Sequence, residues 1–330
     1  MDLRDPTKNQ HFLPQVEQRL NAINPQIKNE NQKIYSFSIK DRDVGIVSID
    51  SEKGVRISKN LSMNDLFSFD VLEKEASKYN FEKLFHSYEV TIKSSTKSLL
   101  SKIDLPKADI KSEVINIFRS KILNFIRNPY SIKRILNTFS SMQDLFPTDP
   151  IHRKNFERVL NGSKPQKNYL CKKLDITENE YKEWLATIFL LLTPMKEEYL
   201  NFLDQFIKRF YENPDLFIQI HIYTYDNEFC LFSDRGYNNY DMERNDMVWE
   251  FNLCSKGFIR YAFVNIDAHI SENIPKEIVD FYKSESKSIS VMKIHNDLTQ
   301  LKYYNQRTVE LCHEHVFGTS KEYQGVTISS

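Results

Sequence analysis

Glycine is scarce in this chain. Only seven of the 330 residues are glycine, whereas about 7% is typical of soluble proteins. No two of them stand in a G-x-G-x-x-G or P-loop arrangement, and those loops need glycine so that backbone N–H groups can approach a phosphate. The composition therefore argues against a dinucleotide-binding fold and against a P-loop NTPase.

The chain also lacks cysteine pairs, net charge and long apolar runs. Its four cysteines form no C-x-x-C pair, and 45 basic residues balance 45 acidic ones. The longest apolar run, residues 184–192, has nine residues, and about 20 are needed to cross a bilayer. Residues 1–10 are polar and carry no secretory signal pattern. We expect a cytoplasmic, reduced protein that binds no membrane and has no general attraction to nucleic acid.

Aromatic residues and helical periodicity dominate the first two thirds of the chain, with 23 Phe and 17 Tyr overall. Residues 34–39 and 44–50 flank the polar turn KDRD and predict a β-hairpin. Thr177 followed by Glu180 predicts a capping box at the start of a helix. Apolar spacings of three and four predict helices over residues 14–23, 64–77, 80–101, 109–127, 131–143, 151–160, 176–193 and 195–212.

The residue pattern changes after Asn213-Pro214, where β-branched and aromatic residues alternate with polar ones. This pattern predicts an α+β fold, with a helical middle region, a mixed or antiparallel sheet and a long C-terminal helix. The predicted strands and closing helices cover residues 216–225, 228–234, 248–253, 258–266, 275–285 and 288–317. We expect three consecutive segments, 1–50, 51–213 and 214–330, within one compact domain.

Asn305 interrupts the apolar stripe of the expected last helix, between Leu301 and Cys312. A buried amide without partners costs about 1–3 kcal/mol, so Asn305 must have hydrogen-bond partners there. Two interpretations remain open. The amide either ties the helix to a neighbouring loop, or it belongs to a functional site.

Three landmarks in the first half of the chain follow one another in a fixed order. Residues 9–15 read NQHFLPQ and precede the expected hairpin. Glu82 and Glu89 are then seven residues apart, which places them on one face of a helix. The signature Arg127-Asn128-Pro129 follows.

Three further landmarks complete the order. Ser233-Asp234 ends an expected strand, and Asn305 lies seven residues before Cys312. In this order the landmarks resemble the bacterial domain-of-unknown-function family 4238, whose opening motif is of the type N-(H/Q)-(Y/H)-(V/I/L)-P. Arg235-Gly236 departs from the Asn-Pro that the family has there, so the chain is identified as a divergent member. The family has no established activity, and the resemblance to a family of this type implies a role in bacterial defence.

His11 is the first candidate for chemistry, since an imidazole acts as an acid, a base or a metal ligand near neutral pH. Asn9 and Gln15 add hydrogen-bonding groups to the same loop. The alternative is a ring that only fixes the start of the fold. Asp234 follows a strand directly, where rigid scaffolds present functional groups, although it also suits a turn.

Two hypotheses follow from these residues. The first is a nuclease or other phosphodiester-directed hydrolase, a defence or toxin-like effector with His11, Asp234 and Asn305 as catalytic residues. Arg127 or Arg307 would then bind the phosphate, with Asn9 and Gln15 as further substrate contacts. No metal-binding motif is present, so the cofactor is unassigned, with a divalent metal as one option. The second hypothesis is a non-catalytic partner subunit of a defence complex. Nucleic acid and another protein of the same operon are the expected partners, and the oligomeric state is open.

Overall fold

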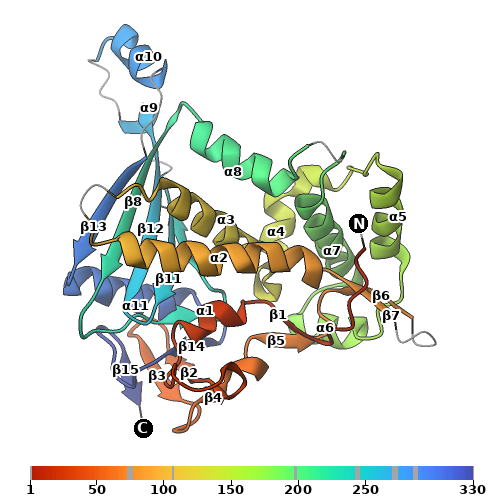
Figure 1. Ribbon diagram of the computed structural model, residues 1–330, viewed down its shortest axis with the longest axis horizontal. Coiled ribbons are helices and arrows are strands. Elements are labelled where there is room, and N and C mark those ends of the chain that lie inside the picture. The colour runs from red at the N-terminus through yellow and green to blue at the C-terminus, as the bar shows by residue number, and fades with distance from the viewer. Residues whose placement is uncertain are drawn as a thin grey trace. The chain divides into compact units, whose positions relative to one another are not determined.

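Figure 1 shows the computed structural model, which describes residues 2–72, 77–105, 108–196, 199–241, 246–269, 274–284 and 289–329. The chain forms two compact units, and each is assembled from separate stretches of sequence. The first unit takes residues 1–16, 59–102 and 112–206, and the second takes 17–58, 103–111 and 207–330. The α+β fold class is confirmed. The units do not follow the three consecutive segments expected from the sequence.

The first unit is mainly helical. Its helices are α2 (Glu82–Lys102), α3 (Lys111–Arg127), α4 (Ile132–Thr138), α5 (Pro150–Asn161), α6 (Lys167–Leu174), α7 (Glu178–Leu192) and the start of α8 (Phe202–Glu212). Two small antiparallel sheets join β1 (Asn9–His11) to β5 (Ser62–Asn64) and β6 (Ser68–Leu72) to β7 (Ser77–Asn80). Helix α1 (Gln15–Arg19) begins in this unit and ends in the second.

Helix α7 forms the core of the first unit. It begins at the predicted capping box, in which the Thr177 hydroxyl accepts from the backbone N–H of Glu180 and the Glu180 carboxylate accepts from that of Thr177. Trp184 is fully buried, packs on Phe67 and donates its indole N–H to the carbonyl of Ile126 at 2.8 Å. The short apolar run of residues 184–192 is therefore a buried core helix. None of the helices in the described part of the chain is long and apolar enough to cross a bilayer.

The helix predicted over residues 64–77 is wrong. Strand β5 ends at residue 64, β6 covers residues 68–72 and β7 begins at residue 77, and residues 73–76 lie outside the described residues. Phe67 and Phe69 are both fully buried, and their spacing of two is the period of a strand. Asp65 has a positive φ of 53°, which breaks a helix at that point.

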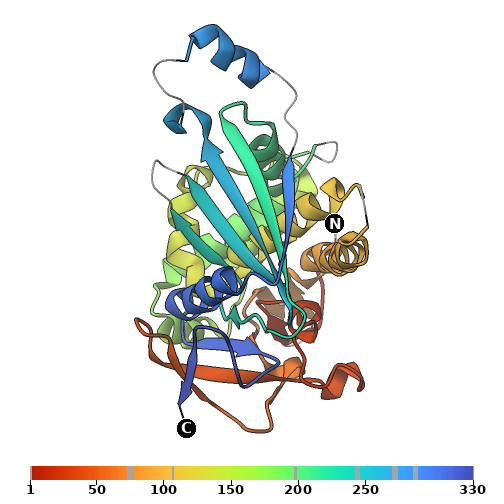
Figure 2. The ribbon, with the colours of Figure 1, turned by 90° about the vertical axis from the view of Figure 1, so that its left-hand side faces the viewer.

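The second unit contains a five-stranded mixed sheet, seen in Figure 2. Its strands, in spatial order, are β10 (Asn238–Asp241), β11 (Met247–Cys254), β12 (Gly257–Asn265), β8 (Leu216–Thr224) and β13 (Ser290–His295). Strand β13 is parallel to β8, and the other neighbours are antiparallel. The mixed sheet of the prediction is thus confirmed. Two short helices, α9 (Ile266–His269) and α10 (Lys276–Ser284), connect β12 to β13.

A second sheet in this unit combines both ends of the chain. It contains β15 (Thr327–Ser329), β3 (Ile46–Ile49), β2 (Lys33–Asp41), β14 (His315–Gly318) and β9 (Phe232–Ser233), with β4 (Val55–Arg56) also paired to β2. The predicted hairpin corresponds to β2 and β3, which pair antiparallel. The strand predicted over residues 228–234 is reduced to β9 and belongs to this sheet, not to the five-stranded one.

The long C-terminal helix predicted over residues 288–317 is wrong. The segment forms β13, then helix α11 (Leu298–Leu311), then β14. Asn296 has a positive φ of 57°, and the Asp297 carboxylate caps α11 by accepting from the N–H of Gln300. Alternating Ser290, Met292 and Ile294 suit a strand. The step between strand and helix is therefore fixed by two local polar residues rather than by the apolar pattern.

Helix α11 packs against β9, β10 and β14. One side joins the cluster formed by Phe37, Val47, Leu231, Val309 and Val316. Another side places the Tyr304 ring parallel to that of Phe258, with centroids 4.0 Å apart. The helix thereby connects the two sheets of the second unit.

Candidate functional site

The segment NQHFLPQ forms a closed hydrogen-bonded latch in the first unit. His11 lies in β1 opposite Ser62, and its Nδ1 is 3.0 Å from the carbonyl oxygen of Asn60. A carbonyl only accepts, so Nδ1 carries the proton and Nε2 accepts from the Gln15 amide at 2.8 Å. Asn9 lies in the same strand, paired with Asn64. Both ring nitrogens of His11 therefore have protein partners.

Asp234 supports a turn in the second unit. Its side chain is 2% exposed. The carboxylate accepts from three successive backbone N–H groups, those of residues 313–315, at 2.7, 2.7 and 3.0 Å. Arg42 donates to the carbonyls of Glu310 and Cys312 at the end of α11, just before that turn. The Asp234 carboxylate on the backbone N–H groups and the Arg42 guanidinium on the backbone carbonyls together stabilise the turn that follows α11.

Asn305 is completely buried, as its place on the apolar stripe predicts. Its carbonyl oxygen accepts from the N–H of Leu231 at 2.9 Å, and its amide donates to the carbonyls of Phe229 and Gln324 at 3.2 Å each. These bonds tie α11 to two loops of the second unit. The geometry matches the structural alternative for this residue.

The three residues proposed as catalytic thus serve three separate backbone segments. His11 belongs to the first unit, whereas Asp234 and Asn305 belong to the second. Asp234 holds the turn before β14, and Asn305 holds the loop before β9 and the loop before β15. Nothing in these contacts gathers the three side chains around a common substrate.

Arg307 is part of a buried charge network on the five-stranded sheet. Glu250 on β11 is fully buried and faces Arg260 on β12. One carboxylate oxygen accepts from Arg260 at 2.7 Å, and the other accepts from Arg307 at 3.0 Å. The Arg307 guanidinium also lies 4.0 Å from the centre of the Tyr240 ring and donates to its hydroxyl. These partners account for Arg307 without a substrate phosphate.

Arg127 differs from the other candidates because its partners leave part of it unused. The side chain is fully buried at the end of α3, and its Nη1 donates to the Glu89 carboxylate at 2.9 Å. The guanidinium lies 5.0 Å from the ring centre of Phe85. Among the described residues, Nε and Nη2 have no hydrogen-bond partner. These two nitrogens share one edge of the guanidinium, the edge that binds carboxylates and phosphates in a bidentate manner.

Glu82 lies beside Arg127 and also has a buried side-chain atom without a hydrogen-bond partner among the described residues. It is the first residue of α2, where its backbone N–H donates to the Asn80 side chain. Its Oε1 is buried, with no hydrogen-bond partner in the described part of the chain. Burial raises the pKa of the Glu82 carboxyl to about 7; Arg127 lowers it, and the Glu89 carboxylate raises it further. Glu82, Arg127 and Glu89 are together called the Glu–Arg–Glu cluster below.

The two helices that carry this cluster lie side by side along their length (Figure 1). Near the far end of the pair, Ser98 and Lys102 of α2 both donate to Glu113 of α3. Midway, the Ser120 hydroxyl donates to the carbonyl of Tyr88. The antiparallel pairing brings the start of α2 to the end of α3. It therefore places Glu82 and Glu89, two turns apart on one helix face, against Arg127.

The cluster offers two chemical abilities in one place. A carboxyl with a pKa of about 7 exchanges a proton at neutral pH. A guanidinium edge with two N–H groups that have no partner among the described residues has the geometry that pairs with an oxyanion. Glu89 is 33% exposed and connects the cluster to solvent. Sequence reasoning singled out the spacing of the glutamates and chose Arg127, but assigned no role to Glu82 or Glu89.

The described residues contain no group of three or more His, Cys, Asp or Glu side chains that could hold a metal ion. Comparisons of the chain with known protein families, with curated proteins and with solved structures found no match. The resemblance to family 4238 therefore stays a prediction from its motifs.

Proposed function

We propose that the chain is a phosphodiester-directed hydrolase, in which Arg127 binds the phosphate and Glu82 is the general acid–base. One observation carries the proposal. A fully buried arginine has one edge without a hydrogen-bond partner in the described part of the chain, beside a carboxyl whose pKa is about 7.

The free edge of Arg127 is costly for the fold. A buried donor without a partner costs about 1–3 kcal/mol, and more when it is charged. Functional sites are where such unfavourable groups are retained, because the substrate completes them. Two non-bridging oxygens of a phosphodiester match the Nε and Nη2 donors in spacing and charge. Phosphate binding would therefore satisfy both orphan donors at once.

Glu82 supplies the proton transfer in this proposal. Its carboxylate form takes a proton from the attacking water as the new P–O bond forms. The resulting carboxylic acid returns a proton to the leaving oxygen as the old P–O bond breaks. Arg127 meanwhile stabilises the charge that develops on the non-bridging oxygens. Glu89 positions Arg127 through its bond to Nη1.

The test compares hydrolysis of bis(p-nitrophenyl) phosphate, single-stranded DNA and RNA, each with and without added Mg²⁺ or Mn²⁺. Glu82→Gln removes the titrating proton, and Arg127→Lys keeps the charge but removes the bidentate edge. We expect each to lower kcat/KM by about 10²–10⁴-fold. Glu157→Gln, at a side chain 60% exposed, is the matched control and should keep full activity. A folded wild type that cleaves none of these substrates, or a fully active Glu82→Gln variant, would refute the proposal.

The second candidate function is a non-catalytic partner subunit. It is favoured by the complete hydrogen bonding of His11, Asp234 and Asn305, which makes these residues part of the framework. Co-expression with the product of the neighbouring gene, followed by size-exclusion chromatography, tests this candidate. The defence role is tested by growth of expressing cells with and without phage, with RNA and DNA integrity checked on gels.

A further inference from the structure

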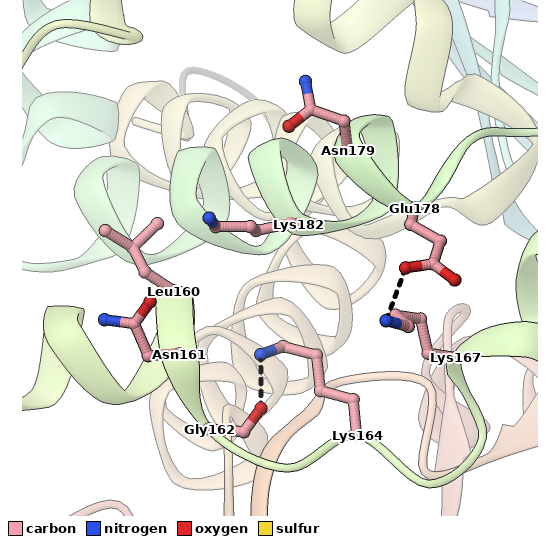
Figure 3. A pocket seen from close by; sticks show the side chains of 8 residues that line it. All are labelled: Leu160, Asn161, Gly162, Lys164, Lys167, Glu178, Asn179 and Lys182. Atoms are coloured by element: carbon pink, nitrogen blue, oxygen red, sulfur yellow. Dashed lines mark hydrogen bonds and ion pairs between the residues drawn. The ribbon is translucent and has the colours of Figure 1, made fainter.

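A pocket of about 550 Å³ lies in the first unit, between the end of α5 and the start of α7 (Figure 3). It is separate from the Glu–Arg–Glu cluster and shares no residue with it. Its lining residues are Leu160, Asn161, Gly162, Lys164, Lys167, Glu178, Asn179 and Lys182. Its volume is in the range of small-molecule sites in proteins.

Three lysines give this pocket an excess of positive charge. The Lys167 ammonium is paired with the Glu178 carboxylate at 2.5 Å, so these two charges cancel. Lys164 donates to the carbonyl of Gly162 at 2.9 Å, a neutral partner. No hydrogen bond or ion pair to the Lys182 ammonium is found among the described residues. Lys164 and Lys182 therefore leave two positive charges without an anion in the lining.

The lysines are close enough to affect one another. Burial lowers the pKa of the Lys164 ammonium to about 8; Asp70 opposes this shift, and the charges of Lys182 and Lys167 add to it. Figure 3 shows the Lys182 and Lys164 side chains on opposite sides of the open centre, with the ion pair of Lys167 at one end. An anion in the centre would relieve the repulsion, and it would be held from two sides.

The remaining lining residues suit the rest of a small organic molecule. Asn161 and Asn179 offer amide donors and acceptors, and Leu160 offers an apolar contact. The pocket also lies at the start of α7, where the helix dipole favours negative charge. The Lys164 and Lys182 ammonium groups, neither of which is paired with a carboxylate of the lining, match the dianion of a phosphate monoester.

We infer that this pocket binds a small phosphomonoester of the size of a mononucleotide, with Lys164 and Lys182 on the phosphate. The site is independent of the proposed hydrolase activity, since its residues take no part in the Glu–Arg–Glu cluster. The hydrolysis assay and the binding assay below therefore test the two proposals separately.

The test is isothermal titration calorimetry of the full chain with AMP, adenosine and inorganic phosphate at pH 7. We expect AMP to bind with a submillimolar Kd and adenosine to bind at least tenfold more weakly. Lys164→Met and Lys182→Met, which keep an unbranched flexible side chain and remove its charge, should each weaken AMP binding about tenfold or more. Lys97→Met, at an exposed position of α2, is the control and should leave the affinity unchanged.

A pH series adds a second readout. Affinity for AMP should fall as the pH rises through about 8, because Lys164 loses its proton there, and Lys164→Met should remove that dependence. Absence of AMP binding at 10 mM, or equal affinity in the wild type and both pocket variants, would overturn the inference. Adenosine as tight as AMP would reject the phosphate contact, and phosphate as tight as AMP would reject the mononucleotide.

Discussion

Replacing Asp234 should destabilise the second unit rather than impair chemistry. The carboxylate accepts three backbone hydrogen bonds of 2.7–3.0 Å and is 2% exposed. A hydrogen bond to a charged group contributes about 1.5–3 kcal/mol. The three bonds share one side chain and lie at a half-exposed turn, so their loss is not additive. We expect Asp234→Ala to lower the free energy of unfolding by about 3–5 kcal/mol.

The isosteric variant gives the sharper comparison. Asp234→Asn keeps one acceptor oxygen and turns an NH₂ group toward a backbone donor, so a loss of about 2 kcal/mol is expected. For a unit of this size, 1 kcal/mol corresponds to about 2–4 °C in Tm. The melting temperature should therefore fall by about 6–20 °C for Asp234→Ala and about 4–8 °C for Asp234→Asn, as measured by differential scanning calorimetry.

Asp226→Asn is the matched control. Its side chain also accepts hydrogen bonds, from Asn296, but it is 63% exposed, and exposed pairs contribute little. An Asp234→Asn variant that melts within 2 °C of the wild type would refute the reasoning about the turn. A variant that keeps its Tm but loses phosphodiesterase activity would instead return Asp234 to the functional site.

Three further substitutions test the buried polar groups. Because Glu82 has a pKa of about 7 in the folded chain against 4.5 ordinarily, the folded state binds more protons between these values. The free energy of unfolding of the wild type should therefore fall by about 2–3 kcal/mol as the pH rises from 4.5 to 7. Glu82→Gln should flatten this pH dependence, as measured by urea titrations. An unchanged pH dependence in the variant would contradict the raised pKa. Asn305→Leu should cost about 2–4 kcal/mol by stranding one N–H and two carbonyl groups, and a wild-type urea midpoint would argue against those bonds. Glu250→Gln leaves Arg260 and Arg307 without their counter-charge and should cost about 3–5 kcal/mol; a smaller loss in 0.5 M salt than in low salt would show that solvent reaches the network.

Local polar signals in the sequence predicted structure better than apolar spacing did. Thr177 and Glu180 form the capping box that their spacing predicts, because a cap depends on neighbours only. The burial of Asn305 followed from its place on one helical stripe. The helix predicted over residues 64–77 failed because the spacing of two between Phe67 and Phe69, which is the period of a strand, was overlooked among apolar spacings of three and four. The long last helix failed because Asn296 and Asp297, which separate β13 from α11, were overlooked as turn and cap residues.

The functional candidates show a different limit. The spacing of Glu82 and Glu89 and the presence of Arg127 were visible in the sequence. The sequence did not show that these side chains have buried polar atoms without hydrogen-bond partners among the described residues, because that depends on how the folded chain packs around them. His11 and Asp234 had the right chemistry for a site, but the His11 ring contacts the distant Asn60 carbonyl as well as the nearby Gln15 amide, and Asp234 accepts from distant backbone N–H groups. No sequence pattern reports on such partners.

The interleaving of the two units has a consequence for the order of events on the ribosome. Strand β2 pairs with β14 and β3 with β15, so Val47 has its partner in β15 only after residue 328 has been made. At about 5–20 residues per second, that delay is roughly 15–55 s. Phe37 and Val47, which are buried in the finished unit, have only the β2–β3 hairpin to join during this time. The first unit, by contrast, has all of its segments once residue 206 has emerged. A nascent chain that has reached residue 206 thus contains every residue of the first unit. The β2–β3 hairpin of the second unit still exposes apolar side chains, which is the kind of surface that chaperones bind.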